Sequence, residues 1–318
     1  MQRRPRQVQK NSLLKTCNVN GGNKMSELKI AKPPIEKVDR TPVVFKNEET
    51  GLMLAGIIYR PRNRKEGEKL PAVVIGGPML SAKELVQSLY GQILAEQGYL
   101  TMVYDNSTIG SSEGHPRGLE DPEMKAGDIR SAVSYLMTVP DVDTDRIAGL
   151  GICGSGVYIP HALRNDSRVK AVVSVVPFTV MSFVTTASDE ELLAQKAAYE
   201  NGEEPERLDL ITGSELTDYY FNTDRGAAAN MVNPVSWSQM AWHKFFPTET
   251  IKELKAPYLV ITAENAFTRE GAEMMYANAN EPKELYVVKN AKHSDMYDVE
   301  EYVLENIEQI KAFFEKYL

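Results

Sequence analysis

The sequence contains few cysteines and few histidines. Its 318 residues include two cysteines, Cys17 and Cys153, and four histidines. Two cysteines cannot form the set of disulfide bonds that stabilises small secreted proteins, and the low cysteine and histidine count argues against a zinc site. We therefore expect a globular protein that is stabilised by a hydrophobic core, for which 42% hydrophobic residues are sufficient.

Positive charge and long apolar runs are also scarce. The chain has 36 lysines and arginines against 44 acidic residues, which gives a net charge of -8. Nucleic acids and anionic membranes attract clustered positive charge, and a membrane span needs about 18 apolar residues in a row. We therefore expect a small-molecule substrate and neither a nucleic-acid nor a membrane partner, and we leave a homodimer open.

Residues 1–24 differ from the rest of the chain. They include six basic residues and no acidic ones, and no apolar segment typical of a signal peptide follows them. We interpret them as a disordered extension, or as sequence upstream of a natural start at Met25, with a targeting role as the alternative. This interpretation predicts a cytoplasmic protein.

From Met25 onward, strand patterns and helix patterns alternate. Short apolar runs typical of strands occupy residues 52–61, 71–77, 100–105, 146–152, 169–177, 258–263 and 284–289. Helical spacing of apolar residues occupies residues 82–98, 121–140, 270–279 and 299–318. This alternation predicts an α/β fold with a mostly parallel, doubly wound sheet, and functional groups are expected where its strands end.

The stretch GICGSG, residues 151–156, has the pattern of a nucleophile elbow. Such a turn holds its nucleophile between a strand and a helix and requires small residues two positions before and after it. Gly151 and Ser155 flank Cys153 in this way, whereas Ser155 would be followed by the branched Val157. We predict that Cys153 is the nucleophile, and the alternative is a buried cysteine packed at a glycine-rich turn.

A cysteine nucleophile requires a base, and His293 is the predicted one because it follows the last predicted strand by four residues. His115, His161 and His243 are the other candidates. His161 should point away from Cys153 along the helix after the elbow. His115 has the pattern of a surface loop. We expect His293 to draw the proton from Cys153, with a resting thiolate–imidazolium pair as one form of the site.

An acidic residue should orient His293, and the order nucleophile, acid, histidine favours Glu264, directly after the strand 258–263. Asp295 and Asp298 remain open as alternatives. Backbone N–H groups should stabilise the oxyanion. We predict one from Gly154, after the nucleophile, and the other from the loop after residues 71–77, at Met79 or Leu80.

These motifs resemble the α/β-hydrolase superfamily and, within it, the dienelactone-hydrolase-like branch, which includes fungal polyketide-tailoring hydrolases. The resemblance covers about residues 43–318 and rests on the stretches GGPMLSAKE, YDNSTIGSSEGHPRG, GICGSG, TAENAFTR and KHSDMYD. It implies an α/β-hydrolase core at residues 25–180 and 251–318. In most members of the superfamily the acid stands where this chain has Ala266, so Glu264 departs from the pattern.

The segment between the predicted strands 169–177 and 258–263 is too long for an ordinary connection between two strands. We predict that residues 181–250 form a helical cap insertion whose aromatic residues bind the substrate. The predicted substrate-binding residues are Phe183, Tyr219, Tyr220, Trp237 and Trp242. The alternative for each of them is a role in attaching the insertion to the core.

Together these features predict a hydrolase that cleaves an activated ester, thioester or lactone through an acyl-enzyme, because thiolate is itself a good leaving group. No metal or organic cofactor is implied. One alternative is an acyltransferase or polyketide-tailoring enzyme with the same triad. Another is a ligand-binding pseudoenzyme in which Cys153 does not react.

Overall fold

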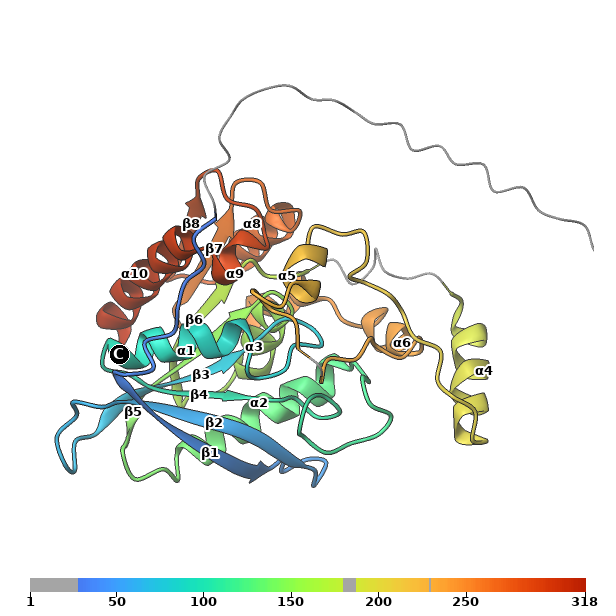
Figure 1. The fold of residues 1–318 in the computed structure, drawn as a ribbon, viewed down its shortest axis with the longest axis horizontal. Helices are drawn as coiled ribbons and strands as arrows, with labels where there is room; N and C mark the ends of the chain where they lie inside the picture. Colours follow the sequence, from blue (N-terminus) through green and yellow to red (C-terminus); the bar gives the residue numbers. More distant parts are fainter. Residues whose placement is uncertain (1–27, 180–186, 229) are drawn as a thin grey trace, which may run out of the picture.

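A computed structural model describes residues 28–179, 187–228 and 230–318 (Figure 1). The described chain contains an eight-stranded sheet in the order β1-β2-β4-β3-β5-β6-β7-β8. β1 and β4 both pair antiparallel with β2, and all other neighbours are parallel. The predicted, mostly parallel sheet is therefore confirmed. The strands are β1 (Val38–Lys46), β2 (Met53–Pro61), β3 (Leu70–Gly76), β4 (Leu100–Tyr104), β5 (Val142–Ile152), β6 (Val169–Val175), β7 (Tyr258–Ala263) and β8 (Lys283–Val288).

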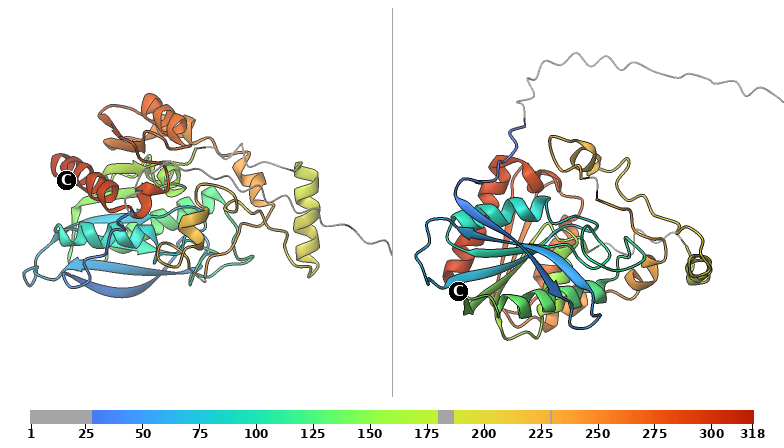
Figure 2. Two further views of the ribbon diagram at one scale, coloured as in Figure 1. Left: turned by 45° about the horizontal axis from the view of Figure 1, so that its top comes forward. Right: turned by 60° about the horizontal axis from the view of Figure 1, so that its bottom comes forward.

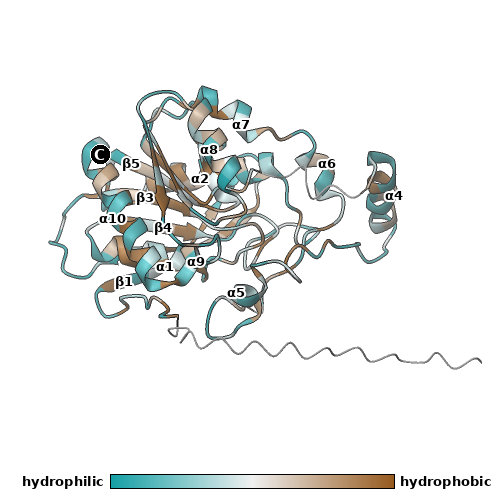
Figure 3. Cartoon of the chain, turned by 90° about the horizontal axis from the view of Figure 1, so that it is seen from above, coloured by the Kyte–Doolittle hydropathy of each residue, from teal (hydrophilic) through white to brown (hydrophobic). Residues whose placement is uncertain are grey.

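Helices cover both faces of this sheet, which explains why β4 and β7 are buried along their whole length. α1 (Val86–Glu96) and α10 (Glu300–Tyr317) share a buried cluster on one face. α2 (Pro122–Leu136), α3 (Ser155–Leu163) and α8 (Arg269–Asn278) share another on the opposite face. Figures 1 and 2 show the two helical layers, and Figure 3 shows the apolar strands between them.

β1 is an edge strand that the sequence patterns do not reveal. It pairs with β2 along its whole length, but only Val38 and Phe45 are fully buried within it. Most of its other residues face solvent, and three of its nine residues, Asp39, Arg40 and Lys46, are charged. A half-exposed strand of this kind lacks the continuous apolar run that marks the central strands.

α3 begins at Ser155, directly after the glycine-rich turn, and continues through Pro160. Proline has no N–H, so the carbonyl of Gly156 one turn earlier loses its helical partner. The hydroxyl of Ser174 on β6 donates to this carbonyl over 2.6 Å. A side chain from the neighbouring strand therefore replaces the missing helical hydrogen bond.

The segment between β6 and β7 carries α4 (Asp189–Glu200), α5 (Thr217–Phe221), α6 (Ser238–Trp242), α7 (Pro247–Thr250) and the 3-10 helix η2 (Ile251–Glu253). We call its described residues 187–228 and 230–250 the insertion. α4 stands away from the body in Figures 1 and 2 and packs through Leu192 against Val235 and Trp237. The predicted substrate contact Phe183 lies outside the described residues, which contain no helix long and apolar enough to cross a membrane.

Candidate active site

Cys153 lies in a strained turn between β5 and α3. Its φ is +55°, in the left-handed region that a non-glycine residue rarely adopts. The turn is held because the N–H of Cys153 donates to the carbonyl of Val175 over 3.0 Å. A Cβ atom at Gly151 would overlap the backbone of Ser155, so the small residue two positions before Cys153 is a steric requirement. This geometry is that of a nucleophile elbow.

Two backbone N–H groups converge on Cys153. The N–H groups of Met79 and Gly154 both lie close enough to the sulfur to lower the pKa of the Cys153 thiol. The two peptides lie side by side, since a Cβ atom on Gly154 would come within 2.8 Å of the Met79 nitrogen. The structure thus brings the two predicted oxyanion residues together next to the sulfur.

Buried acidic residues fix the loop that carries Met79. Leu80 has a φ of +64°, and its N–H faces the carboxylate of Glu120, which accepts from the Tyr158 hydroxyl over 3.0 Å. Asp105 accepts from the backbone N–H of Lys83 over 2.7 Å and from its ammonium group over 2.8 Å. Sequence reasoning missed both acidic residues. Asp105 lies within the stretch YDNSTIGSSEGHPRG, and Glu120 follows the end of that stretch by two residues.

His293 is completely buried in the loop after β8. Its Nδ1 lies 2.8 Å from the hydroxyl of Thr268, and its Nε2 lies 2.9 Å from the hydroxyl of Tyr297. The ring of Phe267 stacks on the imidazole with a centroid distance of 4.6 Å. Burial lowers the pKa of His293 to about 3, so its imidazole is neutral near pH 7.

None of the predicted acidic residues contacts the imidazole. The carboxylate of Glu264 accepts from the N–H of Asn290 over 2.9 Å, and that of Asp295 accepts from the N–H of Lys292 over 2.9 Å. Asp298 binds the guanidinium of Arg225 instead. The geometry therefore differs from the predicted pairing of Glu264 with His293. Glu264 directly follows β7 and binds the turn after β8.

The other histidines bind elsewhere among the described residues. His161 lies between Thr250 and Glu123, and His243 contacts Asp189. His115 lies in the loop between β4 and α2. His293, the predicted base, is the histidine whose ring contacts Tyr297.

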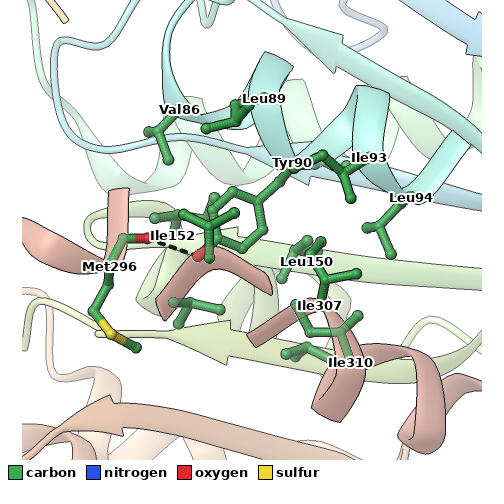
Figure 4. Close-up of a cluster of buried hydrophobic side chains, with 14 of the residues drawn as sticks. Val86, Leu89, Tyr90, Ile93, Leu94, Leu150, Ile152, Met296, Ile307 and Ile310 are labelled. Atoms are coloured by element: carbon green, nitrogen blue, oxygen red, sulfur yellow. Dashed lines mark hydrogen bonds between the residues drawn. The ribbon is translucent and has the colours of Figure 1, made fainter. Parts of the chain in front are cut away.

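Tyr297 joins Cys153 to His293, and sequence reasoning missed it. Its hydroxyl lies 2.9 Å from Nε2 of His293 and is near enough to Cys153 and Tyr220 to lower the pKa of each. It lies on α9 (Asp295–Asp298), where the hydroxyl of Tyr90 on α1 donates to the preceding carbonyl, that of Met296 (Figure 4). The available signal was its position four residues after His293, which places both side chains on one side of a helical turn.

Burial raises the pKa of Cys153 to about 11, and the hydrogen bonds from Tyr297, Gly154 and Met79 only partly oppose this effect. The thiol is therefore protonated near pH 7, while His293 is neutral. This electrostatic state differs from the expected resting thiolate–imidazolium pair. The physical reason is that burial removes both groups from water, which penalises the charged form of each.

An apolar cavity of about 190 Å³ opens above Cys153. It shares Leu80, Ile211 and Tyr220 with a second hollow of about 580 Å³ under α5. The cavity is lined by Pro78, Met79, Leu80, Cys153, Phe178, Leu210, Ile211, Ser214, Leu216, Tyr220 and Phe267. None of these lining residues carries a charge near pH 7.

Of the predicted substrate-binding residues that the structure describes, Tyr220 lines this cavity. Tyr219 packs against Tyr297 with a ring-centroid distance of 4.9 Å. Trp237 packs against Tyr199 on α4, and the indole N–H of Trp242 donates to the carbonyl of Glu120 over 2.9 Å. Trp237 thus packs within the insertion, and Trp242 attaches the insertion to the core, as the alternative interpretation expected.

Comparison with known proteins places the chain in a family. Residues 50–295 match the model of the family described as X-Pro dipeptidyl-peptidase (S15 family). The chain belongs to the S15 family. This match, together with the fold, assigns it to the α/β-hydrolase superfamily.

Three known proteins are similar to this chain. The protein PA2218 of Pseudomonas aeruginosa is 35% identical over 311 residues, which cover 90% of this chain and 83% of that protein. Its crystal structure has a TM-score of 0.81 and covers 89% of this chain and 94% of that chain. A thiohydrolase of Eupenicillium brefeldianum is 26% identical and covers 89% of this chain and 96% of that protein. The α/β hydrolase GrgF of Penicillium sp. sh18 is 21% identical with a TM-score of 0.76, covers 88% of this chain and 99% of that chain, and supports the fold alone.

Proposed function

We propose that this S15-family chain cleaves activated esters, thioesters or lactones through an acyl intermediate on Cys153. The observation that carries the proposal is the left-handed turn at Cys153 with the N–H groups of Met79 and Gly154 at its sulfur. A nucleophile and two backbone donors at this spacing are what acyl transfer requires. The nucleophile elbow and its cysteine also support the resemblance of this chain to the dienelactone-hydrolase-like branch.

The mechanism begins with transfer of the thiol proton toward His293. The sulfur then attacks the substrate carbonyl, and the N–H groups of Met79 and Gly154 stabilise the oxyanion. The tetrahedral species collapses and the leaving alcohol or thiol takes a proton from His293. Water, deprotonated by His293, then attacks the acyl-cysteine and releases the acid together with the free thiol.

The cavity favours uncharged acyl groups. Among the described residues that line it, no carboxylate is available to bind the free α-amino group of a dipeptide, which argues against the peptidase activity in the family's name. A sulfur nucleophile also favours thioesters and activated esters over amides. The tetrahedral species formed from an amide expels the thiolate more readily than the amine and so returns to substrate. The thiohydrolase from Eupenicillium brefeldianum carries a name consistent with this chemistry.

Acyl transfer to an acceptor other than water is the second candidate. Cys153 is 5% exposed and His293 is fully buried, and the cavity above them is apolar. A site of this kind holds water poorly, which lengthens the life of an acyl-enzyme. Product analysis with and without an added thiol or alcohol separates the two outcomes. A new ester or thioester indicates transfer, and free acid alone indicates hydrolysis.

The test is a Cys153→Ala variant assayed with p-nitrophenyl and acyl-thioester substrates. We expect turnover to be lost and the acyl adduct, seen on the wild type by intact-protein mass spectrometry, to disappear. Ser155→Ala is the matched control, because Ser155 is equally buried at the start of α3 and should leave most of the activity. Undiminished turnover by Cys153→Ala would overturn the proposal.

A further inference from the structure

The hydroxyl of Tyr297 lies between the two groups that must exchange a proton. It is 2.9 Å from Nε2 of His293, and it lies close enough to the Cys153 thiol to lower the pKa of that group. Among the described contacts, Nε2 has this hydroxyl as its partner rather than the sulfur. A proton that passes from Cys153 to His293 in this arrangement therefore meets Tyr297 first.

The hydrogen-bond donors around Tyr297 allow a complete relay. Nδ1 of His293 faces the hydroxyl of Thr268 over 2.8 Å and can donate to it, which leaves Nε2 as an acceptor. While Cys153 is protonated, its S–H can donate to the Tyr297 oxygen and Tyr297 can donate to Nε2. Once Cys153 has lost its proton, Tyr297 can donate to the thiolate instead, which lowers the pKa of Cys153. Each donor in this chain has one acceptor.

Burial keeps this chain free of competing water. Cys153, Tyr220, His293 and Tyr297 are all at most 6% exposed. The edge of the Tyr297 ring also meets the imidazole, with centroids 5.4 Å apart and planes at 72°. The Tyr297 hydroxyl is thus fixed in place by packing as well as by hydrogen bonds.

We infer that Tyr297 is a catalytic residue that relays the proton from Cys153 to His293, an inference that rests on the proposed function of Cys153. As the sulfur attacks, its S–H bond breaks and the proton moves to the Tyr297 oxygen. In the same step the O–H bond of Tyr297 breaks and its proton moves to Nε2. The products are a carbon–sulfur bond to the substrate, an oxyanion on the former carbonyl oxygen, an unchanged tyrosine and an imidazolium whose Nδ1–H faces Thr268. When the tetrahedral species collapses, the leaving group takes the proton from the imidazolium, which returns His293 to its neutral form.

The experiment measures how fast iodoacetamide alkylates Cys153, by peptide mapping with Cys17 of the same sample as the reference thiol. Tyr297→Phe and His293→Ala should each slow alkylation by roughly 100-fold, the size expected of a lost general base. The double variant should be no slower than the slower single variant, since both residues act in one chain. Tyr258→Phe is the matched control, because Tyr258 is fully buried and its hydroxyl bonds Ser174 away from the site.

Two results would overturn the relay: an alkylation rate of Tyr297→Phe within threefold of the wild type, or effects of the two single variants that multiply in the double variant. Multiplying effects would mean that Tyr297 merely stabilises the thiolate. If Tyr297→Phe fails to fold, the wild type alone decides. The acylation rate of the wild type is then measured in mixtures of light and heavy water. A plot of this rate against the fraction of deuterium should be curved, because two protons move in one step, and a straight line would contradict the relay.

Alkylation does not depend on an acyl substrate, so the two proposals fail separately. Ester turnover that survives Cys153→Ala would remove the proposed function while the alkylation rates still decide the relay. Conversely, loss of turnover in Cys153→Ala with fast alkylation of Tyr297→Phe would leave the acyl-enzyme in place without the tyrosine.

Discussion

At the scale of single residues, the site is built from groups that are uncharged at rest. Burial raises the pKa of Cys153 to about 11 and lowers that of His293 to about 3. A hydroxyl, that of Thr268, stands at Nδ1 of His293. A carboxylate there would stabilise the imidazolium, whereas a hydroxyl mainly fixes the orientation of the ring. The site therefore favours chemistry in which charge develops only during the reaction.

The burial of His293 also predicts how stability depends on pH. Its pKa is about 3 in the folded chain and 6.5 as a free side chain, so the unfolded state binds the proton more readily. The stabilisation from a neutral His293 is present above pH 6.5 and is lost as the pH falls toward 3. Between pH 6.5 and 5.0 we expect this residue alone to reduce the free energy of unfolding by about 2 kcal/mol.

Urea denaturation of the wild type and of His293→Ala at pH 7.5 and 5.0 measures this effect. The wild type should lose about 2 kcal/mol more than the variant over this interval, because the variant lacks the titrating group. An equal loss in the two proteins would show that other groups control the pH dependence.

At the scale of elements, the short helix α9 is held from three sides. Tyr90 on α1 binds its backbone at Met296 (Figure 4), and Glu215 of the insertion accepts from the N–H of Ser294 over 3.1 Å. Asp298 at the end of α9 binds the guanidinium of Arg225 in the insertion. α9 carries Tyr297, so these contacts connect the insertion to the reacting groups.

The ion pair between Asp298 and Arg225 should contribute strongly to stability. Both side chains are 7% exposed, and removal of one charge leaves the other buried without its partner. We expect Asp298→Asn to reduce the free energy of unfolding by roughly 3 kcal/mol. Asp218→Asn is the matched control, since Asp218 also binds Arg225 but its side chain is 66% exposed, and its cost should stay below about 1 kcal/mol. Urea denaturation of both variants tests this, and similar costs would contradict it.

At the scale of the whole molecule, the site lies where the insertion meets the carboxyl ends of the strands. Leu80 comes from the core, and Ile211 and Tyr220 come from the insertion, and these three residues line both the cavity at Cys153 and the larger hollow beside it. Because both spaces share these residues, an acyl chain of the proposed substrate that extends from the first space toward the second would contact them. The insertion should therefore determine the accepted acyl length.

An Ile211→Trp variant tests this expectation. The larger side chain should fill the passage and lower kcat/KM for p-nitrophenyl octanoate by at least about 10-fold, while acetate changes by less than about threefold. Leu193→Trp is the control, because Leu193 is 55% exposed on α4, away from the cavity. An equal loss on both esters would show that Ile211 affects the catalytic groups rather than the acyl length.

Local sequence patterns determined the architecture and the turn at Cys153. Apolar runs and helical spacing depend on neighbours in the chain, and so do the small residues that the left-handed turn requires, so a single sequence displays them. The same reasoning located Met79, Gly154 and His293, because each follows a strand and parallel strands end at one edge of the sheet. Only the tertiary structure decided what binds His293. The contacts of Thr268 and Tyr297 depend on how α8 and α9 pack, and burial, which sets the pKa values of Cys153 and His293, is a property of the whole fold.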